Sequence, residues 1–247
     1  MVRRLRGATC SVVFQVREGD RDLVLKVPHE GAEERNAFPA MRAFSIHGGV
    51  EVIRSHQPTG AVLMPLLVPG RNLFDSGVGE EEAVPIAATL IQRLRRADPV
   101  QTVDLKTWYR ALFANSDGCI FAEAREVASS LLDSIPNRIL LHGDLHHFNI
   151  LRHGDDWIAI DPKGILGDPS FEIASFMINP MPNPVDSETM RFRLTRFAEL
   201  LGDPVDRLWG WAFSFAVLSH LWERGADSPS LRAAQELRKL RSEFYRH

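Results

Sequence analysis

Residues 142–151 read His-Gly-Asp-Leu-His-His-Phe-Asn-Ile-Leu, and residues 160–164 read Ile-Asp-Pro-Lys-Gly. Short apolar runs bounded by polar turns surround these segments, at 139–141, 150–151 and 157–160. This pattern predicts a small β element whose loops carry polar side chains. We therefore expect Asp144, Asn149 and Asp161 to meet in space, because a hairpin returns the chain to the loop that holds the first two.

Asp144 and Asn149 have the Asp-x-x-x-x-Asn spacing of the protein-kinase catalytic loop, and Asp161 follows a further hairpin. Phosphoryl transfer needs a carboxylate that accepts the proton of a hydroxyl group, and it needs oxygen ligands for the hard cation Mg²⁺. The spacing therefore predicts Asp144 as catalytic base and Asn149 with Asp161 as metal ligands.

The first third of the chain reads as strands with one helix. β-branched runs bounded by turn residues predict strands at 12–16, 23–27, 50–53 and 61–64. Between 32 and 44, apolar residues recur at three- and four-residue spacing, which indicates an amphipathic helix. The apolar segment 65–70 contains Pro and Gly and is interpreted as a linker between two lobes.

From residue 80 onward the periodicity is mostly helical. Helices are expected at 80–96, 119–133, 169–178, 187–201, 204–224 and 230–245. The aromatic-rich stretch 208–222 is too short for a bilayer, which takes about 20 apolar residues, so a buried helix is expected. The outline is an α+β chain with a strand-rich lobe at 1–66, a hinge at 67–70 and a helical lobe at 71–247.

The composition excludes several classes of protein. The 247 residues are 45% hydrophobic and 25% charged, as in soluble globular proteins, and the formal net charge is −3. No segment gathers Lys and Arg as a nucleic-acid binder would, and no apolar leader or membrane span is recognisable. Only two cysteines occur, at positions 10 and 119, which is typical of a reduced, cytoplasmic protein.

Residues 142–151 and 160–164, together with Gly-Asp-Pro-Ser-Phe-Glu at 167–172, resemble the catalytic loop and metal site of the aminoglycoside phosphotransferase family. Asp-Pro-Lys-Gly at 161–164 is typical of its branch of aminoglycoside 6-phosphotransferases (streptomycin kinases) and hydroxyurea phosphotransferases. The resemblance covers nearly the whole chain. It implies a protein-kinase-like two-lobed fold and a kinase that uses ATP or GTP with Mg²⁺. The implied acceptor is a hydroxyl of an aminoglycoside such as streptomycin, or of a related small molecule.

The resemblance also implies a role for Lys26, which would contact the α- and β-phosphates of the nucleotide. Glu34, or alternatively Glu33, would be the helix carboxylate that pairs with it. The residues support such a pair, because Lys26 stands inside an apolar strand and an inward lysine needs a partner.

Two further segments would contact the nucleotide. The resemblance makes residues 66–68 the hinge whose backbone binds the base: Leu66, Leu67 and Val68. The loop expected over the phosphates reads Gly-Ala-Thr-Cys-Ser at 7–11 and lacks the Gly-x-Gly-x-x-Gly pattern. Phosphate binding is therefore expected to depend on Lys26, Ser11 and the metal ion more than on backbone N–H groups.

Two other hypotheses about the function stay open. His142, His146 and His147 next to Asp144 could form the metal cluster of a zinc hydrolase, although Gly143 argues against a ligand-bearing helix there. His142 could equally pack under the loop and orient its backbone. The poor phosphate loop also leaves room for a catalytically silent kinase fold that binds a nucleotide or a partner.

The remaining polar residues have weaker signals. Asp168 and Glu172 surround Pro169 at the start of a helix, so we expect them to support the catalytic loop rather than react. By resemblance, Glu223 and Asp227 could bind a cationic acceptor, although a solvated helix end explains them equally well. Lys163 could contact a phosphate or be an exposed loop lysine.

Overall fold

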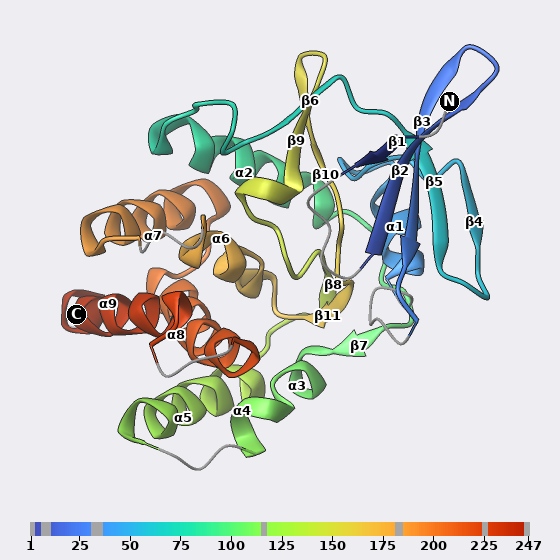
Figure 1. Ribbon diagram of the computed structural model, residues 1–247. Coiled ribbons are helices and arrows are strands. Elements are labelled where there is room, and N and C mark those ends of the chain that lie inside the picture. The colour runs from blue at the N-terminus through green and yellow to red at the C-terminus, as the bar shows by residue number, and fades with distance from the viewer. Residues whose placement is uncertain are drawn as a thin grey trace.

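The computed structural model describes residues 3–5, 11–30, 37–114, 118–180, 185–223 and 227–244, with side chains up to residue 241. Within these ranges the chain forms a small lobe built on a sheet and a larger lobe built mainly of helices (Figure 1). The expected α+β, two-lobed architecture is confirmed. The boundaries at 66/67 and 70/71 stay a prediction.

The small lobe contains a five-stranded sheet in the order β1-β2-β3-β5-β4. Its strands are β1 (Arg3–Leu5), β2 (Ser11–Glu18), β3 (Arg21–Pro28), β4 (Arg54–His56) and β5 (Ala61–Pro65). The β2–β3 hairpin turns at Gly19, whose φ of +61° suits glycine because it has no Cβ. The helix α1 (Phe38–Phe44) joins the sheet through Met41, which shares one apolar cluster with Val62 and Met64.

Two three-stranded sheets lie in the larger lobe, where the sequence predicted a single β element. One has the order β10-β9-β6 and contains β6 (Pro69–Asn72), β9 (Ile150–His153) and β10 (Asp156–Ala159). The other has the order β7-β11-β8 and contains β7 (Val103–Asp104), β8 (Ile139–Leu141) and β11 (Ile165–Gly167). The loop between β8 and β9 connects the two sheets, and this loop is the stretch that carries Asp144 and Asn149.

Helices form the rest of the larger lobe. They are α2 (Glu80–Leu94), α3 (Leu105–Trp108), α4 (Arg110–Ala114), α5 (Cys119–Asp133), α6 (Ala174–Ile178), α7 (Ser187–Leu201), α8 (Val205–Trp222) and α9 (Pro229–Phe244). The short 3₁₀ helices η2 (His147–Asn149) and η3 (Pro169–Ile173) lie beside the two small sheets. The helix α8 packs against α5 and α9 (Figure 1), and all its residues from Leu208 to Ser219 are buried, as expected.

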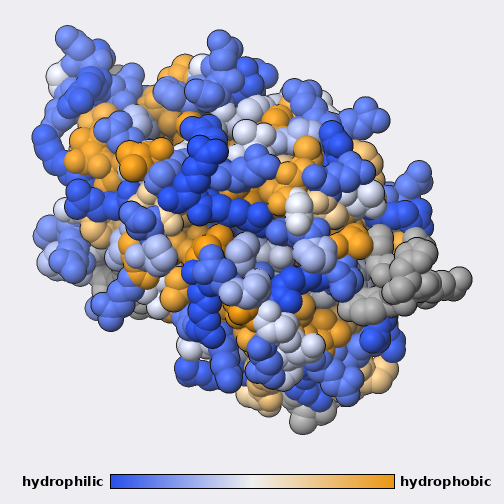
Figure 2. All heavy atoms as spheres, turned by 180° about the vertical axis from the view of Figure 1, so that it is seen from behind, coloured by the Kyte–Doolittle hydropathy of each residue, from blue (hydrophilic) through white to orange (hydrophobic). Residues whose placement is uncertain are grey.

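The surface has the mixture of charged and apolar residues that the composition leads us to expect (Figure 2). On the face opposite to that of Figure 1, apolar residues are interspersed with hydrophilic ones rather than gathered in one area (Figure 2). Among the described residues, no helix combines the length and the apolar character that crossing a membrane requires.

The expected strand at 50–53 is wrong. The strand in this region is β4, and Val50 instead donates its N–H to the carbonyl of Ala159 at 2.9 Å. Val50 is buried in the apolar cluster around Met41, so its β-branched side chain serves packing between the lobes rather than a sheet. Of the helix expected between 32 and 44, only the part from residue 37 can be compared with the structure, where it forms α1; residues 31–36 lie outside the described residues.

Candidate active site

Asp144 lies in the loop between β8 and β9, with its side chain at the wall of a cleft. The Ser175 hydroxyl, on α6, donates to Asp144 Oδ1 at 2.9 Å. The ammonium of Lys163 lies 3.6 Å from Asp144 Oδ2. The Asp144 side chain keeps 25% of its surface exposed, so a molecule in the cleft can reach it.

His142 holds the backbone of this loop. Its Nε2 lies 2.9 Å from the carbonyl oxygen of Ile160, and its Nδ1 lies 3.3 Å from the amide nitrogen of Asp144. A carbonyl accepts and an amide donates, so Nε2 carries the proton and Nδ1 is bare. Burial lowers the pKa of His142 to about 4, which keeps the ring neutral at pH 7. The expectation that His142 packs under the loop and orients its backbone is confirmed.

Only glycine suits position 143, both because of its backbone conformation and because of the side chain beside it. Its φ is +77°, and a Cβ at this position would lie 2.6 Å from Cδ1 of Ile165. The loop can therefore cross β11 only with glycine next to the candidate base.

Glu172, in η3, supports the same loop through hydrogen bonds to its backbone. Its two carboxylate oxygens accept the N–H groups of His142 at 2.7 Å and Gly143 at 2.9 Å. Asp168 is fully buried; it accepts the Ser170 N–H at 2.9 Å and also pairs with Arg207. The expectation that the two acids are structural is confirmed.

Glu172 should make folding stability depend on pH. Burial raises the pKa of this carboxyl to about 7, against the opposing hydrogen bonds from the loop. A raised native pKa means that the folded state binds the proton more tightly than the unfolded state does. The resulting stabilisation is complete below the unfolded pKa, 4.5, and is lost as pH rises to about 7.

We expect Glu172→Gln to remove this dependence. The free energy of unfolding of the parent minus that of the variant should fall by about 1 kcal/mol per pH unit between pH 5 and 7. Urea titrations at several pH values measure it, with the exposed Glu126→Gln as matched control. A difference that stays constant with pH would contradict the assignment.

Asn149 and Asp161 lie on backbone segments that are joined by a hydrogen bond, as their spacing predicts. The N–H of Ile160 donates to the Asn149 carbonyl at 2.9 Å, which brings Asp161 beside η2. The Asn149 amide nitrogen donates to the Asp144 carbonyl at 2.9 Å, and no donor in the described part of the chain binds its side-chain oxygen, which can therefore accept another ligand. An amide oxygen and a carboxylate are the donors that Mg²⁺ prefers, and these residues therefore fit the ion.

Lys26 points inward from β3 and is 7% exposed. Its ammonium forms an ion pair with Asp161. Although burial alone would raise it, the neighbouring Lys26 holds the pKa of Asp161 below its ordinary value. The partner expected from the helix, Glu34 or Glu33, lies outside the described residues and stays a prediction; among the described residues, Asp161 forms an ion pair with Lys26.

At Val68 the structure differs from the expectation that the backbone of the candidate hinge is available to bind a base. The Val68 N–H donates to His153 Nδ1 at 3.0 Å, and the Val68 carbonyl accepts from Gly154 at 2.8 Å. The Leu66 N–H donates to the Asp22 carbonyl at 3.3 Å. The turn between β9 and β10 thus occupies both backbone groups of Val68, and recognition of a base would fall to the Leu66 carbonyl and to Leu67.

The three histidines near Asp144 do not form a metal cluster. His142 binds backbone, His146 lies with Nε2 3.6 Å from Asp144 Oδ1, and buried His147 stacks on Phe176 at 4.0 Å between ring centroids. Burial lowers the pKa of His146, so its ring is neutral at pH 7. In the described part of the chain, no three His, Cys, Asp or Glu side chains are arranged to hold a metal ion. The described residues therefore do not provide the site that a zinc hydrolase needs.

The cleft beside Asp144 has a volume of about 830 Å³. Its walls include Trp108, Arg110, Lys163, Phe215 and Trp222. Trp222 is 50% exposed and meets Trp108 edge to face at 5.6 Å. The end of the aromatic helix thus faces the cleft, although most of the helix is buried as expected.

Glu223 and Asp227 do not line this cleft in the structure. Glu223 accepts the Ser230 hydroxyl at 2.6 Å at the start of α9, and Asp227 pairs with Arg232 at 3.0 Å. Their contacts are those of a helix end, which was the other explanation of these acids.

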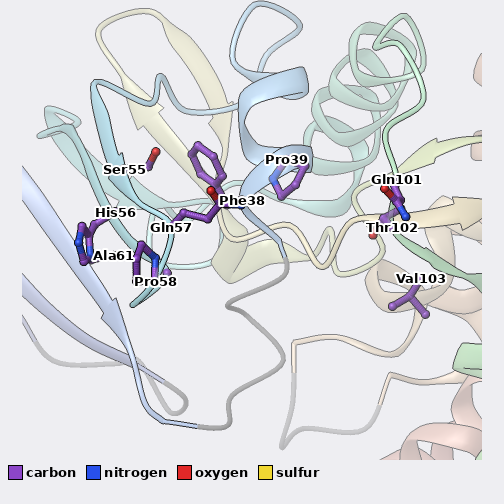
Figure 3. A pocket seen from close by; sticks show the side chains of 11 residues that line it. Phe38, Pro39, Ser55, His56, Gln57, Pro58, Ala61, Gln101, Thr102 and Val103 are labelled. Atoms are coloured by element: carbon purple, nitrogen blue, oxygen red, sulfur yellow. The ribbon is translucent and has the colours of Figure 1, made fainter.

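A second cavity, of about 590 Å³, lies between α1, the β4–β5 hairpin and the segment before β7 (Figure 3). Phe38 and Pro39 contribute from α1, and Gln101 faces them from the other side. It shares Thr102 and Val103 with the cleft but contains none of the expected catalytic residues. Asp144, the expected base, lines the cleft and not this second cavity.

Sequence reasoning missed Ser175 as a contact of the base. It lies three residues after Glu172, so helical spacing would have placed both on the face turned toward the loop. Lys163 was left undecided, because the direction of a loop lysine depends on the backbone of the whole loop.

The arrangement of lobes and loop is that of a protein-kinase-like phosphotransferase. A model of the family described as aminoglycoside/hydroxyurea antibiotic resistance kinase matches residues 3–226. A streptomycin 3''-kinase from Klebsiella pneumoniae is 31% identical over 226 residues, which cover 86% of this chain and 84% of that protein. The chain belongs to the family of aminoglycoside/hydroxyurea antibiotic resistance kinases.

Solved structures show the same fold. A choline/ethanolamine kinase family protein from Mesorhizobium loti gives a TM-score of 0.68 at 17% identity, over 98% of this chain and 87% of that chain. An aminoglycoside phosphotransferase in complex with ADP and hygromycin B gives 0.65 at 18% identity, over 96% and 93%. The resemblance inferred from the motifs is confirmed, and the protein is a small-molecule kinase that acts on a hydroxyl group.

Proposed function

We propose that the protein transfers the γ-phosphoryl group of ATP or GTP, with Mg²⁺, to a hydroxyl of an aminoglycoside such as streptomycin. The observation that carries the proposal is the position of Asp144. Its carboxylate lies at the wall of a cleft of about 830 Å³, in the loop that also holds Asn149. The similarity to a streptomycin kinase over most of both chains supports this acceptor class, and hydroxyurea-like compounds are the second choice.

In this proposal Asp144 is the catalytic base. It accepts the proton of the acceptor hydroxyl while the acceptor oxygen bonds to phosphorus and the nucleotide diphosphate leaves with the bridging oxygen. The Ser175 hydroxyl holds Oδ1, which fixes the rotation of the carboxylate. Glu172 and His142 fix the backbone beneath it, so most of the rate comes from positioning and charge neutralisation.

The donor nucleotide would lie on the side of Lys26. This lysine would contact the α- and β-phosphates, and the Ser11 hydroxyl could donate to a phosphate. Ser11 Oγ is buried and has no hydrogen-bond partner within the described ranges, which suits a donor that awaits a ligand. Residues 66–68 would contact the base through the Leu66 carbonyl and the Leu67 backbone.

Asn149 and Asp161 would hold Mg²⁺. When bound, the ion neutralises charge on the phosphates of the nucleotide. Asp161 is the stronger candidate ligand, because the ion pair with Lys26 favours its ionised form at neutral pH.

The test is transfer of labelled γ-phosphate from ATP and from GTP to streptomycin, other aminoglycosides, hydroxyurea and simple alcohols, with Asp144→Ala as blank. We expect Mg²⁺-dependent phosphorylation of streptomycin or a related aminoglycoside that the blank lacks. Transfer only to another compound would correct the acceptor class. Nucleotide binding with no transfer to any of these compounds would favour the silent kinase fold.

A further inference from the structure

Lys163 is a cationic residue that lies beside the candidate base. Its ammonium is 3.6 Å from Asp144 Oδ2, and the two side chains line the same cleft. Each keeps 25% of its surface exposed. The ammonium is therefore partly exposed in the cleft. A molecule that contacts Asp144 there also comes close to Lys163.

The backbone fixes the origin of this side chain. The Lys163 N–H donates to the carbonyl of His142 at 2.8 Å, two residues before the base. Asp161 and Gly164, on either side, have φ of +63° and +69°, so the chain makes a tight turn there. Lys163 is thus attached directly to the loop of Asp144, and its direction follows from that loop.

Two lysines lie near the two carboxylates, and Lys163 is close enough to both for its charge to act on Asp161 as well. Lys26 pairs with Asp161, the candidate metal ligand, from the small lobe. Lys163, which comes two residues after Asp161 in the same turn, lies beside Asp144.

The ammonium of Lys163 and the carboxylate of Asp144 lie side by side in the cleft, 3.6 Å apart. The acceptor oxygen and the phosphoryl group must meet at Asp144, since this carboxylate takes the proton. A group with three N–H donors at that edge is placed to bind phosphoryl oxygens.

We propose that Lys163 is a catalytic residue that donates hydrogen bonds to the phosphoryl group during its transfer; this rests on the proposed function. The acceptor oxygen bonds to phosphorus, its proton goes to Asp144, and the bond to the nucleotide's bridging oxygen breaks. Lys163 stays protonated throughout and supplies only positive charge. In this proposal Lys26 contacts the α- and β-phosphates of the bound nucleotide, and Lys163 contacts the phosphoryl group while it is transferred.

The first test needs no acceptor. ADP, Mg²⁺ and aluminium fluoride together mimic the transferring phosphoryl group, and calorimetry gives the Kd for ADP with and without fluoride. In the parent and in Lys106→Met, an exposed lysine outside the cleft, fluoride should tighten ADP binding. In Lys163→Met, the tightening should be smaller by a factor of about 10 or more, with an unchanged Kd for ADP alone. Equal tightening in Lys163→Met and the parent would overturn the proposal.

The second test uses turnover with the acceptor found in the transfer assay. Lys163→Met should lower kcat by about 10²–10³ and leave KM for the nucleotide within about threefold, because the contact forms only in the transition state. An unchanged kcat with a raised KM would overturn it. If streptomycin is not phosphorylated, the proposed acceptor fails, but the fluoride measurement still decides the role of Lys163.

Discussion

Replacing Asp144 by asparagine is expected to lower kcat by about three orders of magnitude, with little change in the Kd for the nucleotide. Loss of a positioned base costs about 10²–10⁴ in rate, and an amide cannot take the proton of the acceptor hydroxyl. The amide oxygen of the introduced asparagine can still accept the Ser175 hydroxyl, which now donates to Asp144 Oδ1, so the loop should fold as before. Initial rates of phosphate transfer, with calorimetric titration of ADP, separate the two effects.

Ser175→Ala is the matched control for this substitution. It removes the 2.9 Å hydrogen bond to Asp144 but leaves the carboxylate in place. We expect a loss of about tenfold in kcat, because the base keeps its chemistry and loses only part of its orientation. If Asp144→Asn retained more activity than Ser175→Ala, Asp144 would be a structural residue and the base would have to be sought elsewhere.

The parts of the site that the sequence predicted are those set by local spacing. Asp144 and Asn149 belong to one loop, and the hairpin of β9 and β10 has a length that returns the chain to it. His142 and Gly143 belong to the same continuous segment, in which hydrogen bonds between neighbours follow from the order of residues. Such contacts depend little on how the lobes pack, and a motif is enough to predict them.

The parts that the sequence left open depend on packing between distant elements. The pairing of Lys26 with Asp161 spans 135 residues and crosses from one lobe to the other. The occupation of Val68 by the β9–β10 turn requires that β6 join β9 in one sheet. Neither contact leaves a periodic signal, because periodicity reports which face of an element is buried and not which element covers it.

Short strands were missed for a related reason. β6, β7 and β11 contain two to four residues each, which is too few to show the alternation of a strand. β7 and β11 form a parallel pair from segments about 60 residues apart in the chain, a pairing set by packing alone. The pairing of β8 with β11 and β7 in the sheet that supports the catalytic loop was therefore not predictable from the sequence.

Replacing Asp161 by asparagine is expected to abolish most Mg²⁺-dependent turnover, with a loss of about 10³ or more in kcat. The carboxylate is the charged member of the candidate metal pair, and a neutral amide holds Mg²⁺ far less tightly. Asparagine suits the site because Asp161 has a φ of +63°, a left-handed conformation that Asn adopts about as readily as Asp. Alanine there would add strain of about 1 kcal/mol and confuse folding with metal binding.

The measurement is ADP binding as a function of Mg²⁺ concentration, followed by the transfer rate at saturating Mg²⁺. Asp155→Asn, an exposed acid in the turn between β9 and β10, is the control for loss of one negative charge. It should behave as the parent, whereas Asp161→Asn should need a much higher Mg²⁺ concentration for the same ADP affinity. Identical Mg²⁺ curves for the parent and Asp161→Asn would reassign this carboxylate to the ion pair with Lys26 alone, because the same side chain cannot be a principal metal ligand and be replaced without effect on the metal.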